Sequence, residues 1–401
     1  MMNYILFDST ACHSLLPFTH TRPVADIRCG IFTLRERWES LLKQPTSTAT
    51  SEILQAVYPI SNTADNVYIN GAVVASSTLV ETINKLSFNQ KLVCGELLIA
   101  FRSDSSISWE DIEPTTASYE IVLCECDVQT IKHIWDIFSL NDSILRSDFQ
   151  LLTQGRTSQP LPDNIILVGK EHVFLEAGAT IHAGCIINAS TGPVYLAKDA
   201  EILEGSIVRG PLAMGEHAVI KMGAKIYGAT TIGEGCKVGG EINNVVFFAN
   251  SNKGHDGYLG NAVIGEWCNL GADTNCSNLK NNYDTIKIWD EYASRSIQTG
   301  LQFCGLMMGD HSKCGINTMF NTGTVVGVSA NVFGSGFPEK FIPSFCWGGS
   351  EGLTTYQFKQ AMATASRMMA RRNKALSEAE LELFQHIFKQ TEAQRATFAN
   401  S

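Results

Sequence analysis

The chain has little basic charge and no long apolar run. Its 401 residues carry a formal net charge of −10, and no cluster of Lys and Arg stands out. A nucleic-acid scaffold needs a concentrated basic surface, so the composition argues against one. No stretch approaches the ~20 consecutive apolar residues of a membrane-spanning helix, and the N-terminus lacks the basic flank of a secretory signal. We therefore expect a cytoplasmic protein that acts on small molecules, without nucleic-acid or membrane partners.

Cysteine pairs with metal-binding spacing are also lacking. The 12 cysteines are scattered, and the one close pair, Cys124 and Cys126, is separated by a single residue. Zinc and redox motifs use a two-residue spacer. We interpret the cysteines as reduced, small apolar residues, and the sequence assigns no metal site.

What the sequence does have is an apolar residue at every sixth position over long stretches. Neither a helix nor a simple alternating strand produces this spacing, which is typical of a solenoid. Each group of six predicts a short strand and a bend, three groups close one triangular coil, and the repeated residue points inward. The repeated residues are Leu196, Ile202, Val208, Met214, Ile220, Ile226, Ile232, Val238, then Tyr258, Ile264, Leu270, Cys276, then Met308, Cys314, Phe320, Val326 and Val332.

The spacing is interrupted twice, between Val238 and Tyr258 and between Cys276 and Met308. Interruptions in a solenoid predict loops that leave the prism, and such loops often carry function. The first contains His255 in a polar, glycine-flanked run. A histidine is suited to act as a base near neutral pH, so His255 is either an exposed catalytic base or a surface loop residue.

The remaining sequence divides the chain into four parts. Residues 1–127 alternate short apolar runs with helical stretches and predict an α/β layer domain. Residues 128–164 predict a connecting helix and a polar linker, and residues 165–345 contain the six-residue repeats. Residues 346–401 predict two helices that are broken near Ser377, whose Ser-Glu-Ala-Glu sequence resembles a capping box.

Residues 225–278 resemble the acetyltransferase domain of the bifunctional bacterial family that makes UDP-N-acetylglucosamine. That family's Lys-Ala-Gly-His-Leu-Thr-Tyr-Leu-Gly motif is similar to the run from Asn252 to Gly260, which reads Asn-Lys-Gly-His-Asp-Gly-Tyr-Leu-Gly. The family's following Ile-Gly and Asn-Ile-Gly-Ala-Gly are matched without gaps by Ile264-Gly265 and by the run that starts at Asn269. The resemblance implies a left-handed parallel β-helix of hexapeptide repeats.

The resemblance also implies roles for individual residues. His255 takes the position of the catalytic base, Glu241 that of the carboxylate that orients it, and the Ala272 N–H that of the oxyanion donor. The later coils imply an acetyl-CoA groove between neighbouring subunits, and therefore a homotrimer. The sugar-phosphate pocket is implied at Tyr258, Asn269 and Asn278, and the acetyl-CoA groove at Ala272, Gly315, Ile316 and Gly327.

The chain departs from the family at the substrate phosphate. Two basic residues of the family correspond here to Lys225 and Asn243, so one charge is lost. Phosphate recognition must therefore differ or depend on Lys253 or Lys280. Residues 280–303 also form a longer segment than in the common enzyme.

The N-terminal domain resembles a variant branch of the same family, recognisable by Leu-Pro-Phe-Thr-His-Thr-Arg-Pro at residues 16–23. The family's glycine-rich phosphate loop is replaced by a glycine-free run after Phe7, and Asn70-Gly71 stands where a metal-binding Gly-Asp is expected. Arg22 and Arg28 either bind triphosphate oxygens or are structural ion-pair partners. If this domain is active, it uses UTP and Mg²⁺, with Arg22, Arg28 and Asn70 as nucleotide-binding candidates.

Three hypotheses follow from the sequence. The first is an acetyl-CoA-dependent N-acetyltransferase that acts on a sugar phosphate, glucosamine 1-phosphate, joined to a sugar-1-phosphate uridylyltransferase. The second is a sugar-1-phosphate nucleotidyltransferase with a structural β-helix. The third is a non-catalytic trimeric scaffold. His255, Glu241 and Asn269 favour the first, because a purely structural coil needs none of them.

Overall fold

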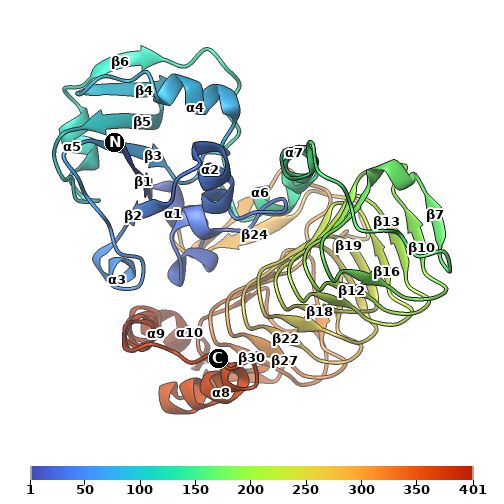
Figure 1. Ribbon diagram of the computed structural model, residues 1–401. Coiled ribbons are helices and arrows are strands. Elements are labelled where there is room, and N and C mark those ends of the chain that lie inside the picture. The colour runs from blue at the N-terminus through green and yellow to red at the C-terminus, as the bar shows by residue number, and fades with distance from the viewer. Residues whose placement is uncertain (1, 400–401) are drawn as a thin grey trace. The chain divides into compact units, whose positions relative to one another are not determined.

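The computed structural model describes residues 2–399, which form two compact units (Figure 1). The first unit comprises Met1–Leu15, Thr21–Ile27 and Phe32–His133. The second comprises Leu16–His20, Arg28–Ile31 and Ile134–Ser401. Two short N-terminal segments therefore belong to the unit that contains the repeats. Within residues 2–399, no helix is long and apolar enough to cross a membrane.

The first unit is built around a six-stranded mixed sheet with the order β2-β1-β3-β5-β4-β6. β1 is parallel to β2 and β3, and β5 runs antiparallel to β3 and β4. Buried side chains cover both faces of the sheet, so the predicted α/β layer domain is confirmed. Its elements are β1 (Asn3–Phe7), α1 (Ala11–Ser14), η2 (Val24–Asp26), α2 (Leu34–Leu42), β2 (Thr46–Ala49), α3 (Glu52–Gln55), β3 (Asn66–Asn70), α4 (Ser77–Ile83), β4 (Gln90–Cys94), β5 (Leu97–Ser103), α5 (Ile112–Thr116) and β6 (Glu120–Leu123).

The second unit is a parallel β-solenoid with three faces, which confirms the predicted repeat fold. Face A stacks β7 (Ile166–Val168), β10 (Ile186–Asn188), β13 (Ile207–Arg209), β16 (Lys225–Tyr227) and the first halves of β19 (Glu241–Phe247) and β21 (Tyr258–Ile264). Face B stacks the second halves of β19 and β21 with β8 (Val173–Leu175), β11 (Val194–Leu196), β14 (Leu212–Met214), β17 (Thr230–Ile232), β26 (Met307–Met308), β29 (Val325–Val326) and β31 (Phe341–Ile342). Face C stacks β9 (Thr180–Ile181), β12 (Glu201–Ile202), β15 (Val219–Ile220), β18 (Lys237–Val238), β20 (Asn252–Lys253), β22 (Asn269–Leu270), β27 (Lys313–Cys314), β30 (Asn331–Val332) and β32 (Cys346–Gly349).

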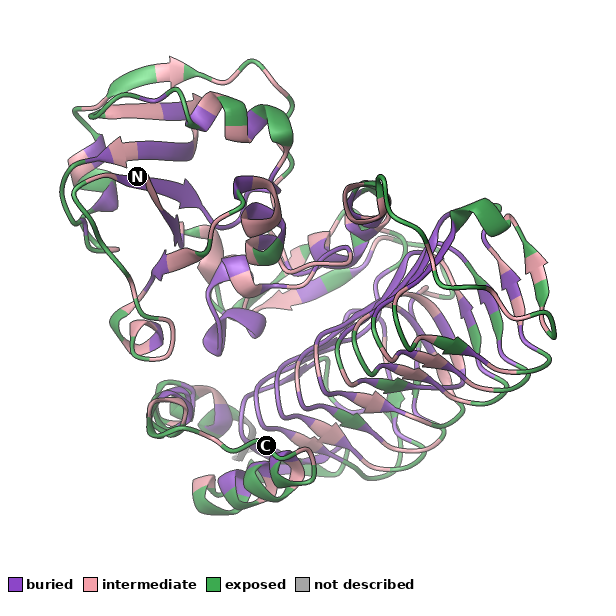
Figure 2. Ribbon diagram, in the orientation of Figure 1, coloured by how far each residue is buried: buried purple, intermediate pink, exposed green. Residues whose placement is uncertain are grey.

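An apolar core fills the solenoid and contains every predicted inward residue except Tyr258. Figure 2 shows buried residues along successive coils. Tyr258 pairs with Glu241 and is half-buried, whereas its neighbour Leu259 pairs with the inward Ile242 and is fully buried. The reason is that β19 and β21 each have seven residues and turn a corner within one strand. The inward residues there are five positions apart, as in Leu259 to Ile264, instead of six.

The first interruption of the spacing is therefore not a loop that leaves the prism, and that prediction is wrong. The coil continues through residues 238–258 with shorter steps, and His255 lies at an ordinary corner between β20 on face C and β21 on face A. The inward position on β20 is taken by Lys253, which pairs with Val238 of the coil below. A template of apolar residues does not detect a lysine at this position.

The second interruption is a true excursion. Between β23 (Asn275–Cys276), which pairs with β28 (Met319–Phe320), and β26 the chain forms the antiparallel hairpin of β24 (Lys287–Asp290) and β25 (Arg295–Gln298). A bridge between Leu279 and Phe303 closes its base.

Helices complete the second unit. Before the solenoid lie η1 (Phe18–His20), α6 (Asp136–Ser139) and α7 (Asn141–Thr153), and η3 (Lys170–His172) lies between β7 and β8. After β33 (Gly352–Thr355) come α8 (Phe358–Ala370), α9 (Glu378–Gln390) and α10 (Glu392–Ala399), one helix more than predicted. The predicted capping box at Ser377 is formed with Glu380, and it starts α9.

Candidate active site

Face A brings together several residues that the sequence selected. Lys225, Glu241 and Tyr258 occupy equivalent outward positions on β16, β19 and β21. Successive coils are one strand spacing apart, ~4.8 Å, so the three side chains form a continuous polar column. Lys225 is exposed, while Glu241 and Tyr258 are half-buried. The column therefore offers one cation and one carboxylate beside an aromatic hydroxyl.

The Tyr258 hydroxyl is fixed by asparagines. Asn278 Nδ2 lies 3.0 Å from Tyr258 Oη and donates a second bond to Asn261 Oδ1 at 2.8 Å. Burial raises the pKa of Tyr258, while hydrogen bonds from Asn243 and Asn278 lower it. Asn243, Tyr258 and Asn278 thus lie together as the resemblance implies, and Asn261 joins them. Its position on β21, three residues after Tyr258, gave no sequence signal.

The absence of a side chain at Gly260 leaves room for the Tyr258 ring. A Cβ atom at Gly260 would collide with Tyr258 Oη and with Asn278 Nδ2, so a side chain here would displace the ring. Gly260 is the last residue of the sequence motif, and close approach of the ring explains why a glycine is needed.

Glu241 contacts Tyr227 and not His255. Tyr227 Oη donates to Glu241 Oε1 at 2.7 Å, and burial and this carboxylate raise the pKa of Tyr227. Within residues 2–399 the His255 ring has no hydrogen bond, so the expected Glu241–His255 pair is not formed. Glu241 is linked to the turn that carries His255 through the backbone, where Glu241 N donates to Gly257 O at 3.2 Å. Tyr227 was missed, although its outward position two residues after Lys225 could have identified it.

The turn that carries His255 is held from inside the prism. Lys253 is fully buried, and its Nζ donates to the carbonyl oxygens of His255 at 2.9 Å, Asp256 at 3.1 Å and Gly239 at 3.4 Å. Burial lowers the pKa of Lys253 to about 8. An ammonium group with these backbone partners is not presented to a substrate, so the expectation that Lys253 binds phosphate is corrected. His255 itself is exposed.

Ala272 lies at the corresponding corner one coil further along. Its carbonyl accepts from Asn317 N at 2.8 Å, whereas no group in the described part of the chain accepts its N–H. The N–H is therefore available as an oxyanion donor. Asn269 is exposed on β22 of face C, in register with Asn252.

The residues implied in the acetyl-CoA groove lie at two different corners. Gly315 and Ile316 follow β27 at the same corner type as His255 and Ala272, and Ile316 is 71% exposed. Gly327 follows β29 on face B instead and is buried. A Cβ atom on Gly327 would collide with Ser344, so this glycine permits close packing of coils and does not join Gly315 within one chain.

The first unit contains a cavity of about 690 Å³ at the carboxyl ends of β1 and β3. Ligands in open α/β sheets bind at this edge. Phe7, Asp8 and Asn70 form the floor, and Trp109 and Lys132 also line it. The expected participation of Asn70 in this site is consistent with its place. Its side chain also donates to Leu98 O at 3.0 Å and accepts from Ala72 N at 3.0 Å.

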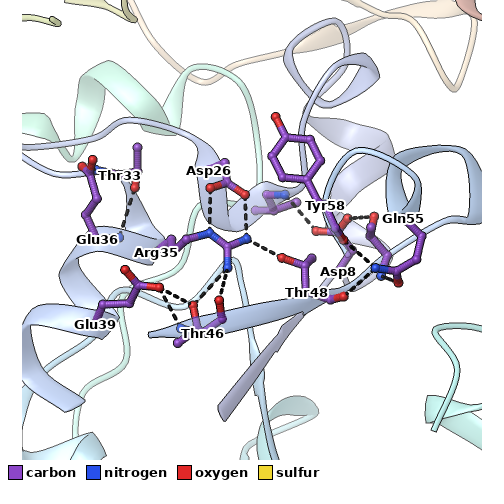
Figure 3. A network of polar contacts seen from close by, with 12 residues as sticks. Asp8, Asp26, Thr33, Arg35, Glu36, Glu39, Thr46, Thr48, Gln55 and Tyr58 are labelled. Atoms are coloured by element: carbon purple, nitrogen blue, oxygen red, sulfur yellow. Dashed lines mark hydrogen bonds and ion pairs between the residues drawn. The ribbon is translucent and has the colours of Figure 1, made fainter. Parts of the chain in front are cut away.

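Asp8 replaces the start of a glycine-rich loop and is used structurally. Its carboxylate accepts from Val24 N at 2.8 Å and from the Thr50 hydroxyl at 2.6 Å, and burial raises its pKa to about 6. Figure 3 shows the adjoining network, in which Arg35 binds both oxygens of Asp26 at 2.7 Å and reaches Thr46 Oγ1 at 3.0 Å. These bonds attach the segment after β1 to β2.

The two arginines expected at the nucleotide do not line this cavity. Arg22 is buried, and Arg28 belongs to the second unit, where its guanidinium donates to the Ile31 carbonyl. Of the two roles expected for them, this placement favours the structural one, and triphosphate binding stays a prediction. In the described residues, no group of three or more His, Cys, Asp or Glu side chains is placed to hold a metal ion.

Comparison with known proteins identifies a family model for the N-terminal part and several related sequences. Residues 4–157 match the family model described as sugar nucleotidyl transferase. A bifunctional protein GlmU from Synechococcus elongatus is 23% identical over 229 residues, 52% of this chain and 46% of the relative. A bifunctional sugar-1-phosphate nucleotidylyltransferase/acetyltransferase from Sulfurisphaera tokodaii is 29% identical over 144 residues, 35% of each chain. A GlmU from Rubrobacter xylanophilus is 34% identical over 128 residues, 31% of this chain and 26% of the relative.

The chain spans less than half the length of these relatives. Among solved structures, an Arabidopsis UDP-N-acetylglucosamine acyltransferase is 14% identical with a TM-score of 0.23, and the match covers 58% of this chain and 93% of the other. The family model covers the α/β unit, and these relatives are named as bifunctional proteins, one of them as a sugar-1-phosphate nucleotidylyltransferase/acetyltransferase. Residues 4–157 thus match the sugar nucleotidyl transferase family model, the chain is similar to GlmU proteins over part of its length, and a β-solenoid and C-terminal helices follow the matched domain.

Proposed function

We propose that the solenoid transfers an acetyl group from acetyl-CoA to the amine of a sugar phosphate, with glucosamine 1-phosphate as the acceptor. The observation that carries this proposal is the polar column of Lys225, Glu241 and Tyr258, next to the turn that exposes His255. A purely structural coil would need neither an exposed imidazole at this corner nor a fixed tyrosine hydroxyl.

The chemistry assigns a task to each group. The acetyl thioester supplies the acyl group, and the acceptor must present a neutral amine. His255 removes a proton from the amine as its nitrogen attacks the thioester carbonyl; the C–S bond then breaks, and coenzyme A leaves as a thiol after it takes the proton from His255. The free N–H of Ala272 stabilises the negative charge that develops on the acetyl oxygen. Lys225 faces the phosphate, and the hydroxyl of Tyr258 with the amide of Asn278 binds the sugar.

The acetyl-CoA groove in this proposal is completed by a second copy of the chain. Gly315 and Ile316 lie at the same corner of the prism as His255 and Ala272, on a later coil. Ile316 exposes an apolar side chain there. We expect a homotrimer in which this corner faces a neighbouring solenoid, with Asn269 on the bordering face C and Gly327 supporting the coils.

The cavity of the first unit favours a second activity, sugar-1-phosphate uridylyl transfer. It lies at the strand ends of a domain that matches the sugar nucleotidyl transferase family. Mg²⁺ uses a few carboxylates together with phosphate oxygens. Asp8 is committed to Val24 and Thr50, and the glutamates that the structure describes in the lining do not form a group placed to hold a metal ion, so in this proposal Mg²⁺ would enter bound to the phosphates of UTP.

Mass spectrometry of reactions with the full chain tests both activities. Acetyl-CoA is offered with glucosamine 1-phosphate, glucosamine 6-phosphate or glucosamine, and we expect N-acetylated product with the first. UTP and N-acetylglucosamine 1-phosphate are offered separately with Mg²⁺. Product in the second reaction alone would support a nucleotidyltransferase with a structural β-helix, and no product in either would support a non-catalytic scaffold.

A further inference from the structure

A second cavity, of about 740 Å³, lies beside the β24–β25 hairpin. We call it the hairpin cavity. It shares no lining residue with the 690 Å³ cavity of the first unit or with the polar column on face A. Its wall combines the hairpin with the approach to β31 and the helix α10. The residues that matter for its chemistry are Lys280, Lys287, Trp289, Lys340, Phe341 and Gln394.

The charge of this wall is positive. Three lysines line it, and Glu339 is the one acidic residue in the lining. Lys280 Nζ also lies 3.7 Å from the exposed Asp284 carboxylate. Lys280 and Lys340 line the same cavity, and burial together with the charge of Lys280 lowers the pKa of Lys340. Two cations kept together in a cavity favour an anion with several oxygens, such as a phosphate group.

The cavity also has an aromatic wall. Trp289 stacks on Phe341 with ring centroids 5.2 Å apart and an angle of 18° between the planes. Phe341 is buried, while Trp289 is only half-buried and lines the cavity. A rigid ring that is supported on one side offers its surface to a planar ligand.

A buried polar atom without a partner lies in the same wall. Gln394 Oε1 is buried and has no hydrogen-bond partner in the described part of the protein. A buried amide oxygen without a hydrogen bond destabilises the protein, so a ligand that donates to it would be favoured. This observation is independent of the lysines and of the stacked rings.

We propose that the hairpin cavity binds a nucleoside phosphate. The base lies against Trp289, its edge donates to Gln394, and the phosphate oxygens contact Lys280 and Lys340. Two sources share this chemistry: a uridine nucleotide, or the adenosine 3′,5′-bisphosphate end of coenzyme A. Within one chain the cavity lies at the corner between faces A and B. His255, Ala272 and Ile316 lie at a different corner, between faces C and A. The proposal does not depend on the acetyl-transfer reaction.

Isothermal titration calorimetry of the full chain tests the proposal with UDP, adenosine 3′,5′-bisphosphate and inorganic phosphate. We expect at least one nucleotide to bind 10-fold or more tightly than phosphate. The K280Q/K340Q variant and, separately, W289L should each weaken that binding by 10-fold or more. The matched K170Q/K198Q variant, which removes two exposed lysines of the early coils, should bind as the unchanged protein does.

The two nucleotides identify the source, because the one whose binding is lost in K280Q/K340Q is the ligand of this cavity. Binding that survives in both K280Q/K340Q and W289L would overturn the proposal, as would phosphate binding as tightly as either nucleotide. Circular dichroism checks that each variant is folded. An H255A variant should retain the binding, so failure of the acetyl-transfer proposal is distinguished from failure of this one.

Discussion

At the residue scale, the turn of His255 differs from the motif it resembles. Lys253 stands where that motif has alanine, at a position that points into the prism. A buried cation is costly unless its protons are satisfied. Here three backbone carbonyls accept them, and one is the carbonyl of His255 itself. The lysine therefore fixes the backbone from which the imidazole projects.

This arrangement predicts a pH dependence that K253M should remove. The pKa of Lys253 is lowered by burial from 10.5 to about 8, so between these values the unfolded chain holds a proton that the folded chain has lost. Stability therefore rises with pH across that window for this group. We expect the unfolding free energy of the unchanged protein to rise relative to that of K253M from pH 8 to 10, in urea titrations. Parallel curves for the two proteins would contradict the assignment.

His255 is expected to matter for the reaction but not for the fold. H255A should lower the rate of coenzyme A release in the presence of glucosamine 1-phosphate on the order of 10²–10⁴-fold, because a general base is lost. H217A is the control, since His217 is also an exposed histidine at a corner of the solenoid but lies outside the column. Equal rates for H255A and H217A would remove His255 from the mechanism.

At the element scale, the sequence predicted the solenoid well and its register less well. The six-residue spacing identified the inward residues from Leu196 to Val238 and from Ile264 onward. The six-residue spacing failed in β19 and β21. A strand that bends around a corner places its inward residues five positions apart, and the apolar pattern before and after it does not reveal this change. The polar column became visible only once the coils were stacked, since Tyr227 and Asn261 are far from their partners in sequence.

The corrected register can be tested at two adjacent positions. L259A should destabilise the solenoid by about 2–5 kcal/mol, because it leaves a cavity in a fully buried site. Y258F should leave the denaturation midpoint nearly unchanged while it lowers acetyl transfer, since only a hydroxyl on the outer face is removed. The reverse pattern, with Tyr258 critical for stability and Leu259 tolerant, would restore the six-residue register.

At the scale of the whole molecule, the division into two units runs through the N-terminal motif, since Leu16–His20 belong to the second unit and Thr21–Ile27 to the first. Phe18 packs on Phe248 with centroids 5.4 Å apart, and His20 Nε2 lies 2.9 Å from Glu291 Oε1 at the tip of the hairpin, all within the second unit. The Leu-Pro-Phe-Thr run thus serves as packing for the solenoid. Local sequence could not predict this, because the contacts join residues more than 200 positions apart.

The proposed homotrimer can be tested in solution. If the acetyl-CoA groove is completed by a neighbouring chain, sedimentation velocity should give a single trimer of a 43.8 kDa subunit. An I316D variant should shift the population toward monomer and lower acetyl transfer together, because it places a charge on the apolar corner. A fully active monomer would contradict a shared groove.

The most direct test is a crystal structure of the full chain with coenzyme A and glucosamine 1-phosphate. We predict that the sugar amine lies about 2.6–3.2 Å from a ring nitrogen of His255, the distance of a hydrogen bond to a general base. The coenzyme A sulfur should lie at the same corner, near the Ala272 N–H. A pantetheine chain bound at another face of the prism, with His255 remote from the amine, would contradict the proposed acetyl transfer.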